Sequence, residues 1–244
     1  MERLHEGIKI RAHWTWQAWR REDSGLLTPL WNVAYDNLVV TEGRNTLLAR
    51  TFDAVPADVN WYVGLIGAGA GTVSITSGAD AVTGSGTSFT SADNGSDMII
   101  VGAGASGLDL VTTINAFTSG TSVSVANNAS ATVSGAAYAV EPRPADVMNS
   151  KSFNELTAYS EANRQAWTKN GAPASGAMSN SSSKARFTIN AANTRIFGGF
   201  LSSNNTKGGT TGLLFGGGLF SVGSKLMQSG ELLDVQIDLS ITAS

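Results

Sequence analysis

The chain has 244 residues, a formal net charge of −3 and no cysteine. That length suits one large β domain or two smaller ones. The charge gives no general attraction to nucleic acid or anionic lipid, and the missing cysteine excludes disulfides and thiolate metal sites. Charged residues make up only 14% of the chain, against roughly 25% in an average protein. Gly, Ser, Thr, Asn and Ala replace them and favour short strands and turns over long helices.

The N-terminal segment has the clearest period-two pattern. Six apolar residues alternate with polar ones, which places them on one face of a strand: Ile8, Ile10, Ala12, Trp14, Trp16 and Ala18. Asp23-Ser24-Gly25 is a turn signal, and residues 30–35 can return as the partner strand. The pattern predicts a hairpin, which forms an N-terminal arm over residues 7–40.

A helix and a short strand are expected next. Residues 41–52 read as a helix with Thr41 as the N-cap and with Leu47, Leu48 and Phe52 facing inward. Residues 61–66 read as an apolar strand.

The composition changes sharply in the middle of the chain. No Lys or Arg occurs between Arg50 and Arg143. Short strands are predicted at residues 73–75, at 82 and at 98–101, 108–114 and 123–125. The pair Val73–Val82 is echoed by the pair Val123–Val133, which suggests two related hairpins. Residues 67–71 and 141–144 have the composition of two legs that carry an insertion.

Charges of both signs return after Pro144, and strands are predicted at residues 187–189, 196–201, 213–220 and 233–241. The last of these alternates cleanly, with one face buried and one solvated. We therefore predict an all-β protein. Residues 1–66 and 145–244 form an outer domain, a jelly roll or related β-sandwich, and residues 67–144 form a smaller inserted β-sandwich. Removal of 67–144 is expected to leave a folded outer domain.

One motif imitates a cofactor site. Residues 98–107 are an apolar run followed by GxGxxG, as at the start of a dinucleotide-binding fold. That chemistry needs a following helix and an acidic residue roughly 20 positions later. Residues 108–114 are β-branched instead, and no Asp or Glu lies between Asp109 and Glu141. We predict a strand–turn–strand here and no cofactor.

Other reactive side chains are too scattered for catalysis. The two histidines are His5 and His13, which lie ~26 Å apart on one strand and cannot share a metal within one chain. Glu231, Asp234 and Asp238 are interpreted as solvent-face charges rather than as a glycosidase pair. Asp93 to Asp97 reads as an acidic turn rather than a calcium loop. We expect no catalytic, cofactor-binding or metal-binding residues.

The tryptophans and arginines of the N-terminal segment admit two interpretations. Trp packs in cores because it buries a large area, and Trp and Arg also concentrate binding energy at subunit interfaces. The interface candidates are Trp14, Trp16, Trp19, Trp31, Arg11 and Arg20. The core interpretation is favoured for Trp14 and Trp16.

Several stretches outside the insertion occur in a recognisable order: a Trp-rich hairpin at 14–31, Trp-Tyr-Val-Gly-Leu-Ile at 61–66, and the segments 153–161, 164–167, 198–201, 207–212 and 219–220. In this order they resemble a family of small virion structural proteins of tailed bacteriophages. In that family the Trp-Tyr-Val-Gly-Leu-Ile strand runs almost directly into the segment matching 145–148, so residues 67–144 are extra here. That block resembles the small Ser/Thr/Gly-rich β modules of phage tail and capsid accessory proteins.

The resemblance implies a non-enzymatic virion component. We expect a capsid decoration or cement protein that associates as a homotrimer and docks on the major capsid protein or another virion protein. The alternative is a neck, tail or baseplate accessory protein whose inserted domain binds host-surface glycans. The charged residues of Met1 to Glu6 do not fit a signal peptide, and residues 110–140 are too polar to span a bilayer. The expected location is therefore the virion surface after synthesis in the host cytoplasm, with no membrane and no nucleic acid as partner.

Overall fold

The computed structural model describes residues 8–53 and 60–243. Within these residues the chain forms nineteen β-strands, one α-helix and three short 3-10 turns. All paired strands are antiparallel. The predicted all-β, sandwich-like fold is confirmed.

The larger sheet has ten strands and joins the two outer segments of the chain. Its order is β11-β3-β16-β17-β2-β1-β19-β13, with β12 also paired to β3 and β14 to β19. These strands are β1 (Ile8–Arg21), β2 (Leu27–Val39), β3 (Tyr62–Ile66), β11 (Glu155–Leu156), β12 (Gln165–Ala166), β13 (Ala177–Ser179), β14 (Ala185–Thr188), β16 (Gly198–Ser202), β17 (Leu214–Leu219) and β19 (Leu232–Ala243). A separate ribbon pairs β15 (Thr194–Ile196) with β18 (Lys225–Met227).

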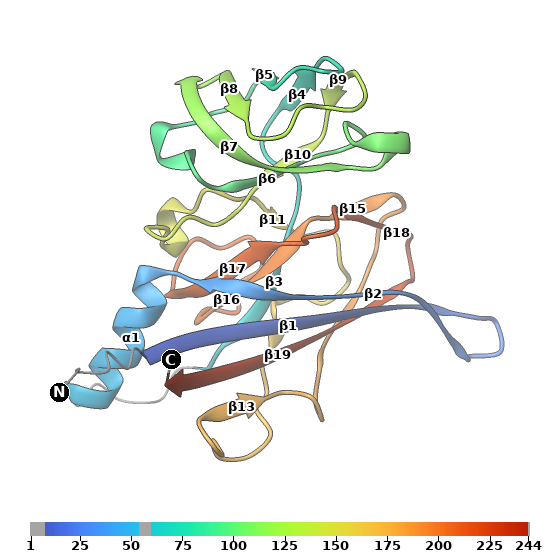
Figure 1. Ribbon diagram of the computed structural model, residues 1–244. Coiled ribbons are helices and arrows are strands. Elements are labelled where there is room, and N and C mark those ends of the chain that lie inside the picture. The colour runs from blue at the N-terminus through green and yellow to red at the C-terminus, as the bar shows by residue number, and fades with distance from the viewer. Residues whose placement is uncertain (1–7, 54–59, 244) are drawn as a thin grey trace.

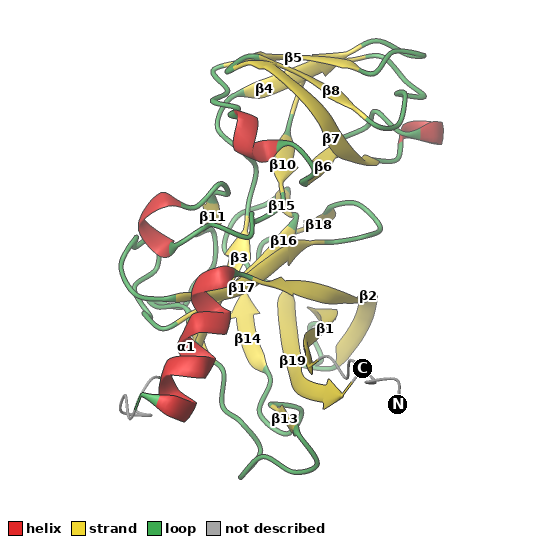
Figure 2. Cartoon of the chain, turned by 60° about the vertical axis from the view of Figure 1, so that its left-hand side comes forward, coloured by secondary structure: helices red, strands yellow, loops and turns green. Residues whose placement is uncertain are grey.

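The smaller sheet has seven strands in the order β10-β6-β7-β8-β5-β4-β9. Among the described residues these strands pair only with one another. They stand at one end of the molecule, while β1 and β19 lie side by side toward the other end (Figures 1 and 2). The strands are β4 (Thr72–Ile75), β5 (Ala81–Ser85), β6 (Asp97–Ile100), β7 (Leu110–Ser119), β8 (Ser122–Val125), β9 (Val133–Ala136) and β10 (Tyr138–Val140).

One of the two expected hairpins in this sheet is present. β4 pairs with β5, as the spacing of Val73 and Val82 predicts. The second prediction is wrong, because β8 pairs with β5 and β7, whereas β9 pairs with β4. The local valine spacing differs by only one residue between the two places, and the pairing of β4 with β9 decides the difference.

The N-terminal hairpin has the predicted alternation. β1 lies between β2 and β19, so both edges of the strand are paired, and its alternate residues Ala12, Trp14, Trp16 and Ala18 are buried on one face. Trp14 and Trp16 are 1% and 0% exposed and stack with their ring centroids 5.7 Å apart. The turn closes at Gly25, whose φ of 84° is the left-handed conformation that glycine tolerates.

A buried cluster joins the two sheets. Ile66, Phe153 and Phe200 of the outer strands and loops pack in one cluster with Ile99 and Ala139 of the smaller sheet. Each sheet also has a core of its own. Removing residues 67–144 would therefore expose Ile66, Phe153 and Phe200 to water. An outer domain that folds without the insertion would carry this uncovered apolar patch.

Helix α1 (Thr41–Phe52) has the predicted bounds but not the predicted cap, and of the three residues predicted to face inward only Leu47 packs against the core. The N-cap is Val40, without a side-chain capping bond, and Thr41 is the first helical residue. Leu48 and Phe52 are 58% and 78% exposed. Besides Leu47, the helix packs through Gly43, which is buried against the backbone of Phe215 in β17.

This contact reverses the usual effect of alanine in a helix. Gly→Ala in a helix normally stabilises by about 0.5–1 kcal/mol, but a Cβ on Gly43 would overlap the Phe215 carbonyl. We expect Gly43→Ala to lower the free energy of unfolding by about 1–3 kcal/mol, measured by urea denaturation. Asn45→Ala, at an exposed position of the same helix, is the control and should change stability by less than about 0.5 kcal/mol. A Gly43→Ala protein more stable than the parent would contradict this packing.

Candidate functional site

The two legs of the insertion lie side by side and create a pocket between the sheets. The Gly69 N–H donates to the Tyr138 carbonyl at 2.7 Å, and the Gly67 N–H donates to the Asn154 carbonyl at 2.9 Å. The Tyr138 hydroxyl donates to the Ala70 carbonyl at 2.8 Å. These bonds hold residues 67–70 between the segments 138–143 and 151–154. The space that remains is a pocket of about 220 Å³.

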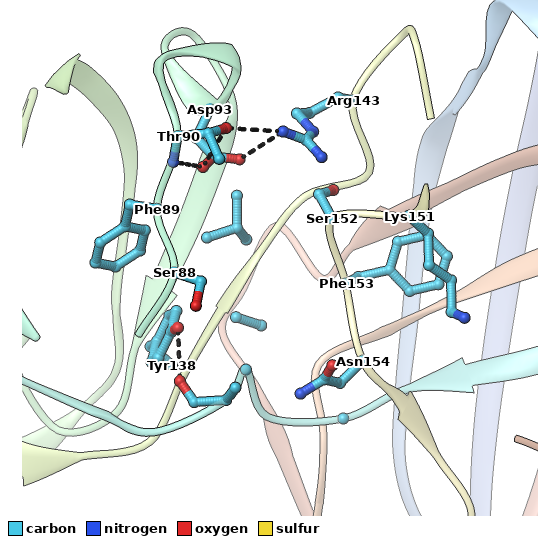
Figure 3. A pocket seen from close by; sticks show the side chains of 15 residues that line it. Ser88, Phe89, Thr90, Asp93, Tyr138, Arg143, Lys151, Ser152, Phe153 and Asn154 are labelled. Atoms are coloured by element: carbon cyan, nitrogen blue, oxygen red, sulfur yellow. Dashed lines mark hydrogen bonds and ion pairs between the residues drawn. The ribbon is translucent and has the colours of Figure 1, made fainter. Parts of the chain in front are cut away.

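Residues from both parts of the chain line this pocket (Figure 3). The smaller sheet and its loops contribute one side, and the segment that follows the insertion contributes the other. The lining residues with large or polar side chains are Ser88, Phe89, Thr90, Asp93, Tyr138, Val140, Arg143, Lys151, Ser152, Phe153 and Asn154.

An ionic network closes one end of the pocket. The Arg143 Nε donates to Asp146 at 3.0 Å, and its Nη1 donates to the Thr90 hydroxyl at 3.0 Å and lies 3.5 Å from an Asp93 oxygen. Asp93 and Asp146 are 5% and 2% exposed. Asp146 also accepts a hydrogen bond from the Ser152 hydroxyl at 2.6 Å. Arg143 thus bridges one acid of the insertion, Asp93, and one acid of the following segment, Asp146, and fixes the angle between the two parts.

Aromatic rings form the base of the pocket. Phe89 and Tyr138 pack with centroids 5.5 Å apart, and Phe153 packs on Phe200 at 5.0 Å. Burial, with a smaller contribution from the charge of Asp93, raises the pKa of Tyr138 to about 12. Tyr138 therefore stays a neutral hydrogen-bond donor at physiological pH.

A second, more open depression continues from the pocket. This groove has a volume of about 570 Å³ and shares Gly67, Lys151, Phe153 and Asn154 with the pocket. The Lys151 ammonium lies 6.0 Å from the Phe153 ring centroid. Partial burial lowers the pKa of Lys151, an effect that the charge of Glu155 opposes.

A buried ion pair holds the far wall of the groove, which includes Gly208 and Thr210. Arg164 donates to the two carboxylate oxygens of Glu155 at 2.9 and 2.7 Å. Its remaining N–H groups donate to the carbonyls of Asn204 at 2.8 Å and Gly209 at 2.7 Å. The side chains of Arg164 and Glu155 are 0% and 3% exposed. One arginine thus positions the loop over residues 204–210.

Glu141 is the most perturbed acid near the pocket. It follows β10 in the second leg, and its N–H donates to the Asp97 carbonyl at 2.8 Å. Burial, followed by the negative charge of Asp97, raises the pKa of Glu141 to about 7. The neutral and the charged acid are therefore both populated near neutral pH.

The six predicted interface residues lie away from this pocket and groove. Trp14 and Trp16 are in the core. Trp19 and Trp31 are half-buried, and Trp31 packs edge-on against Phe220. The two arginines are at the surface and paired: Arg11 lies 3.8 Å from Asp36, and Arg20 binds Glu231 at 2.9 Å.

Two acidic residues differ from the prediction. Asp234 and Glu231 are 6% and 4% exposed, so the interpretation as solvent-face charges is wrong for both. Arg186 donates two hydrogen bonds to Asp234, at 2.6 and 2.7 Å, and Arg20 covers Glu231. Their partners come from distant parts of the chain, so the local alternation of 233–241 does not reveal them.

The remaining motifs have structural roles. GxGxxG at residues 102–107 is a turn between the antiparallel strands β6 and β7, as predicted, and the Gly102 N–H donates to Asp109 at 3.2 Å. His13 hydrogen-bonds Asp36 at 2.8 Å, and His5 lies outside the described residues. Over residues 8–53 and 60–243, the structure brings together no group of three metal-ligating side chains. Asp93 instead caps its own turn, accepting from the Thr90 N–H at 2.7 Å.

The pocket is not evident from the sequence, because four separate segments build it. The one local signal is that Arg143 and Lys151 follow a long stretch without Lys or Arg.

Comparison with known proteins gives no relative. No family model, curated protein or solved structure matches the chain. In the described part of the chain, α1 is too short and too polar to serve as a membrane span.

Replacing the buried Arg164 is expected to lower the free energy of unfolding much more than replacing the exposed Arg11. Arg164→Met would leave Glu155 charged, buried and unpaired, so we expect a loss of about 3–5 kcal/mol of unfolding free energy, measured by urea denaturation. Arg11→Met, which breaks an exposed pair, should cost less than about 1 kcal/mol. Equal effects of the two substitutions would contradict the assigned role of Arg164.

Glu141 predicts a pH dependence of stability. Because its pKa is raised in the folded protein, the folded state binds the proton more tightly than the unfolded state, and stability falls as pH rises from about 4.5 to about 7. At roughly 1.4 kcal/mol per pKa unit, the loss is roughly 3 kcal/mol. Relative to the parent, Glu141→Gln should remove this part of the slope in denaturation curves across that range. Glu22→Gln, at an exposed turn position, should leave it unchanged. A parental slope in Glu141→Gln would assign the pH dependence to other groups.

Proposed function

We propose that this chain is a non-enzymatic structural component of a tailed-phage particle, a capsid decoration or cement protein. Its outer β domain, residues 1–66 and 145–244, docks on the major capsid protein or another virion protein and associates as a homotrimer. Residues 67–144 project outward from the virion surface. The ordered Trp-rich and Gly-rich stretches described above support the assignment to a virion.

The arrangement of the two sheets is the observation that carries the proposal. The smaller sheet is attached through two adjacent legs and stands at the end opposite β1 and β19 (Figure 1). The network around Arg143 and the shared apolar cluster hold it in one orientation. A rigid module at one end of an anchoring domain is what a surface protein needs in order to present one part and bury another.

Attachment would come from the burial of apolar and aromatic side chains at the docking face. The many copies on one particle would add their binding together. Among the six interface candidates, Arg11 and Arg20 are exposed and Trp19 and Trp31 are half-buried. These four residues, rather than Trp14 and Trp16, are available to contact a partner. Trp14 and Trp16 support the docking face from within.

The second candidate function is a neck, tail or baseplate accessory protein that binds host-surface glycans. The observation that favours it is the polar pocket at the base of the insertion. Both candidates place the protein in a particle, and they differ in copy number.

Copy counting tests the proposal. Quantitative mass spectrometry of purified particles is expected to find this chain at hundreds of copies, because a decoration protein follows the capsid lattice. A small number set by tail symmetry would support the accessory role instead, and absence from particles would overturn both. The same particles incubated with host surface polysaccharide should release no reducing ends. Release that depends on this chain would overturn the non-enzymatic assignment.

A further inference from the structure

The pocket and the groove adjoin each other at the junction of the two sheets, and together they are called the depression. They share four lining residues, Gly67, Lys151, Phe153 and Asn154. The pocket, at about 220 Å³, is smaller than the roughly 300–1,000 Å³ of sites that enclose drug-sized ligands. It has room for one ring-sized group, and the groove, at about 570 Å³, has room for the rest of an elongated ligand.

The walls are rich in groups that both donate and accept hydrogen bonds. Phe89, Tyr138 and Phe153 are almost wholly buried and give the base a fixed apolar surface. Hydroxyl and amide side chains surround this base and are exposed to solvent: Ser88, Asn149, Ser150, Asn154, Thr157 and Thr210. Sugars present apolar C–H faces together with hydroxyl groups that donate and accept, so this lining matches their surface.

One positive charge in the depression is left without a carboxylate. The two nearest acids are already engaged, since Glu155 binds Arg164 and Asp146 binds Arg143. Among the described residues, no carboxylate lies within ion-pair distance of the Lys151 ammonium. In Figure 3 this ammonium lies on the side of Phe153 away from Tyr138. A half-buried, unpaired cation beside the groove attracts an anionic group.

We propose that this depression binds an acidic oligosaccharide, with one sugar ring in the pocket and a carboxylate-bearing sugar beside Lys151 in the groove. The site goes beyond the structural role proposed above and does not depend on where in the particle the protein sits. It would give the particle an affinity for polysaccharides that carry uronic acids.

The lining favours a saccharide over an acidic peptide. A peptide would require either an unpaired strand edge or an apolar anchor pocket. Here residues 67–70 already bond to Tyr138 and Asn154 along the pocket, and hydroxyls and amides supply most of its polar groups. Both Arg143 and Arg164 are paired with internal carboxylates, so the depression offers one cation without a carboxylate rather than a cluster.

Binding to the full chain can be measured with three matched probes. They are hyaluronan tetrasaccharide, which alternates glucuronate and N-acetylglucosamine; fully N-acetylated chitotetraose, which is neutral; and tetraglutamate. Titrations followed by isothermal calorimetry and by amide chemical shifts would give both affinity and location. We expect the hyaluronan fragment to bind tightest and to shift amides of residues 67–70 and 151–157.

Charge variants test the role of Lys151. Lys151→Gln should weaken hyaluronan binding roughly tenfold, to the level of chitotetraose, while Lys151→Arg should retain most of it. Lys169→Gln removes a charge from an exposed loop outside the depression and should have no effect. An unchanged urea midpoint of Lys151→Gln would show that the fold is intact.

Three results would overturn the inference. One is the absence of shifts at residues 67–70 and 151–157 with either sugar. The second is equal binding of tetraglutamate and hyaluronan, which would leave an anion site without sugar recognition. The third is an unchanged hyaluronan affinity in Lys151→Gln. None of these results affects copy number in particles, so the two proposals fail independently.

Discussion

The packing of Trp16 against the backbone of Gly199 is the constraint on which the outer domain depends. A Cβ at Gly199 would overlap the indole ring, so the close approach of β1 and β16 requires glycine there. Along the sheet these strands are separated by β17 and β2. The contact therefore means that the sheet curls over itself and closes a sandwich-like core. Phe220 completes the closure, packing edge-on against Trp16 at 5.1 Å.

An aromatic ring also packs directly on a glycine where the outer sheet meets the insertion. Gly64 in β3 lies directly under the ring of Phe200, where a Cβ would overlap it. Phe200 in turn packs on Phe153, which lines the pocket, and lies 5.1 Å under the Arg164 guanidinium. One aromatic ring thus couples the core, the buried ion pair and the base of the depression. A change in the curl of the sheet would move both walls of the depression together.

The sequence predicts those features of the fold that neighbouring residues determine. Period-two patterns in β1 and β19, the turn at Gly25 and the bounds of α1 all depend on a few adjacent side chains. Features that depend on distant partners were predicted wrongly or not at all. The packed face of α1 contains Gly43 and Leu47 but not Leu48, because β17 lies against Gly43. Asp234 is buried because Arg186, far away in the chain, covers it.

Charge at the junction of the sheets follows from where the chain places its cations. The stretch between Arg50 and Arg143 has none, so before its second leg the only charged side chain that the insertion contributes to the pocket is Asp93. The cations follow later in the chain: Arg143 in the second leg is held by Asp93 and Asp146, and Lys151 in the returning segment is left unpaired. Because opposite ends of the depression therefore differ in charge, an anionic chain entering it would be oriented. Its carboxylate would lie toward Lys151, and its uncharged ring would lie toward Tyr138 and Asp93.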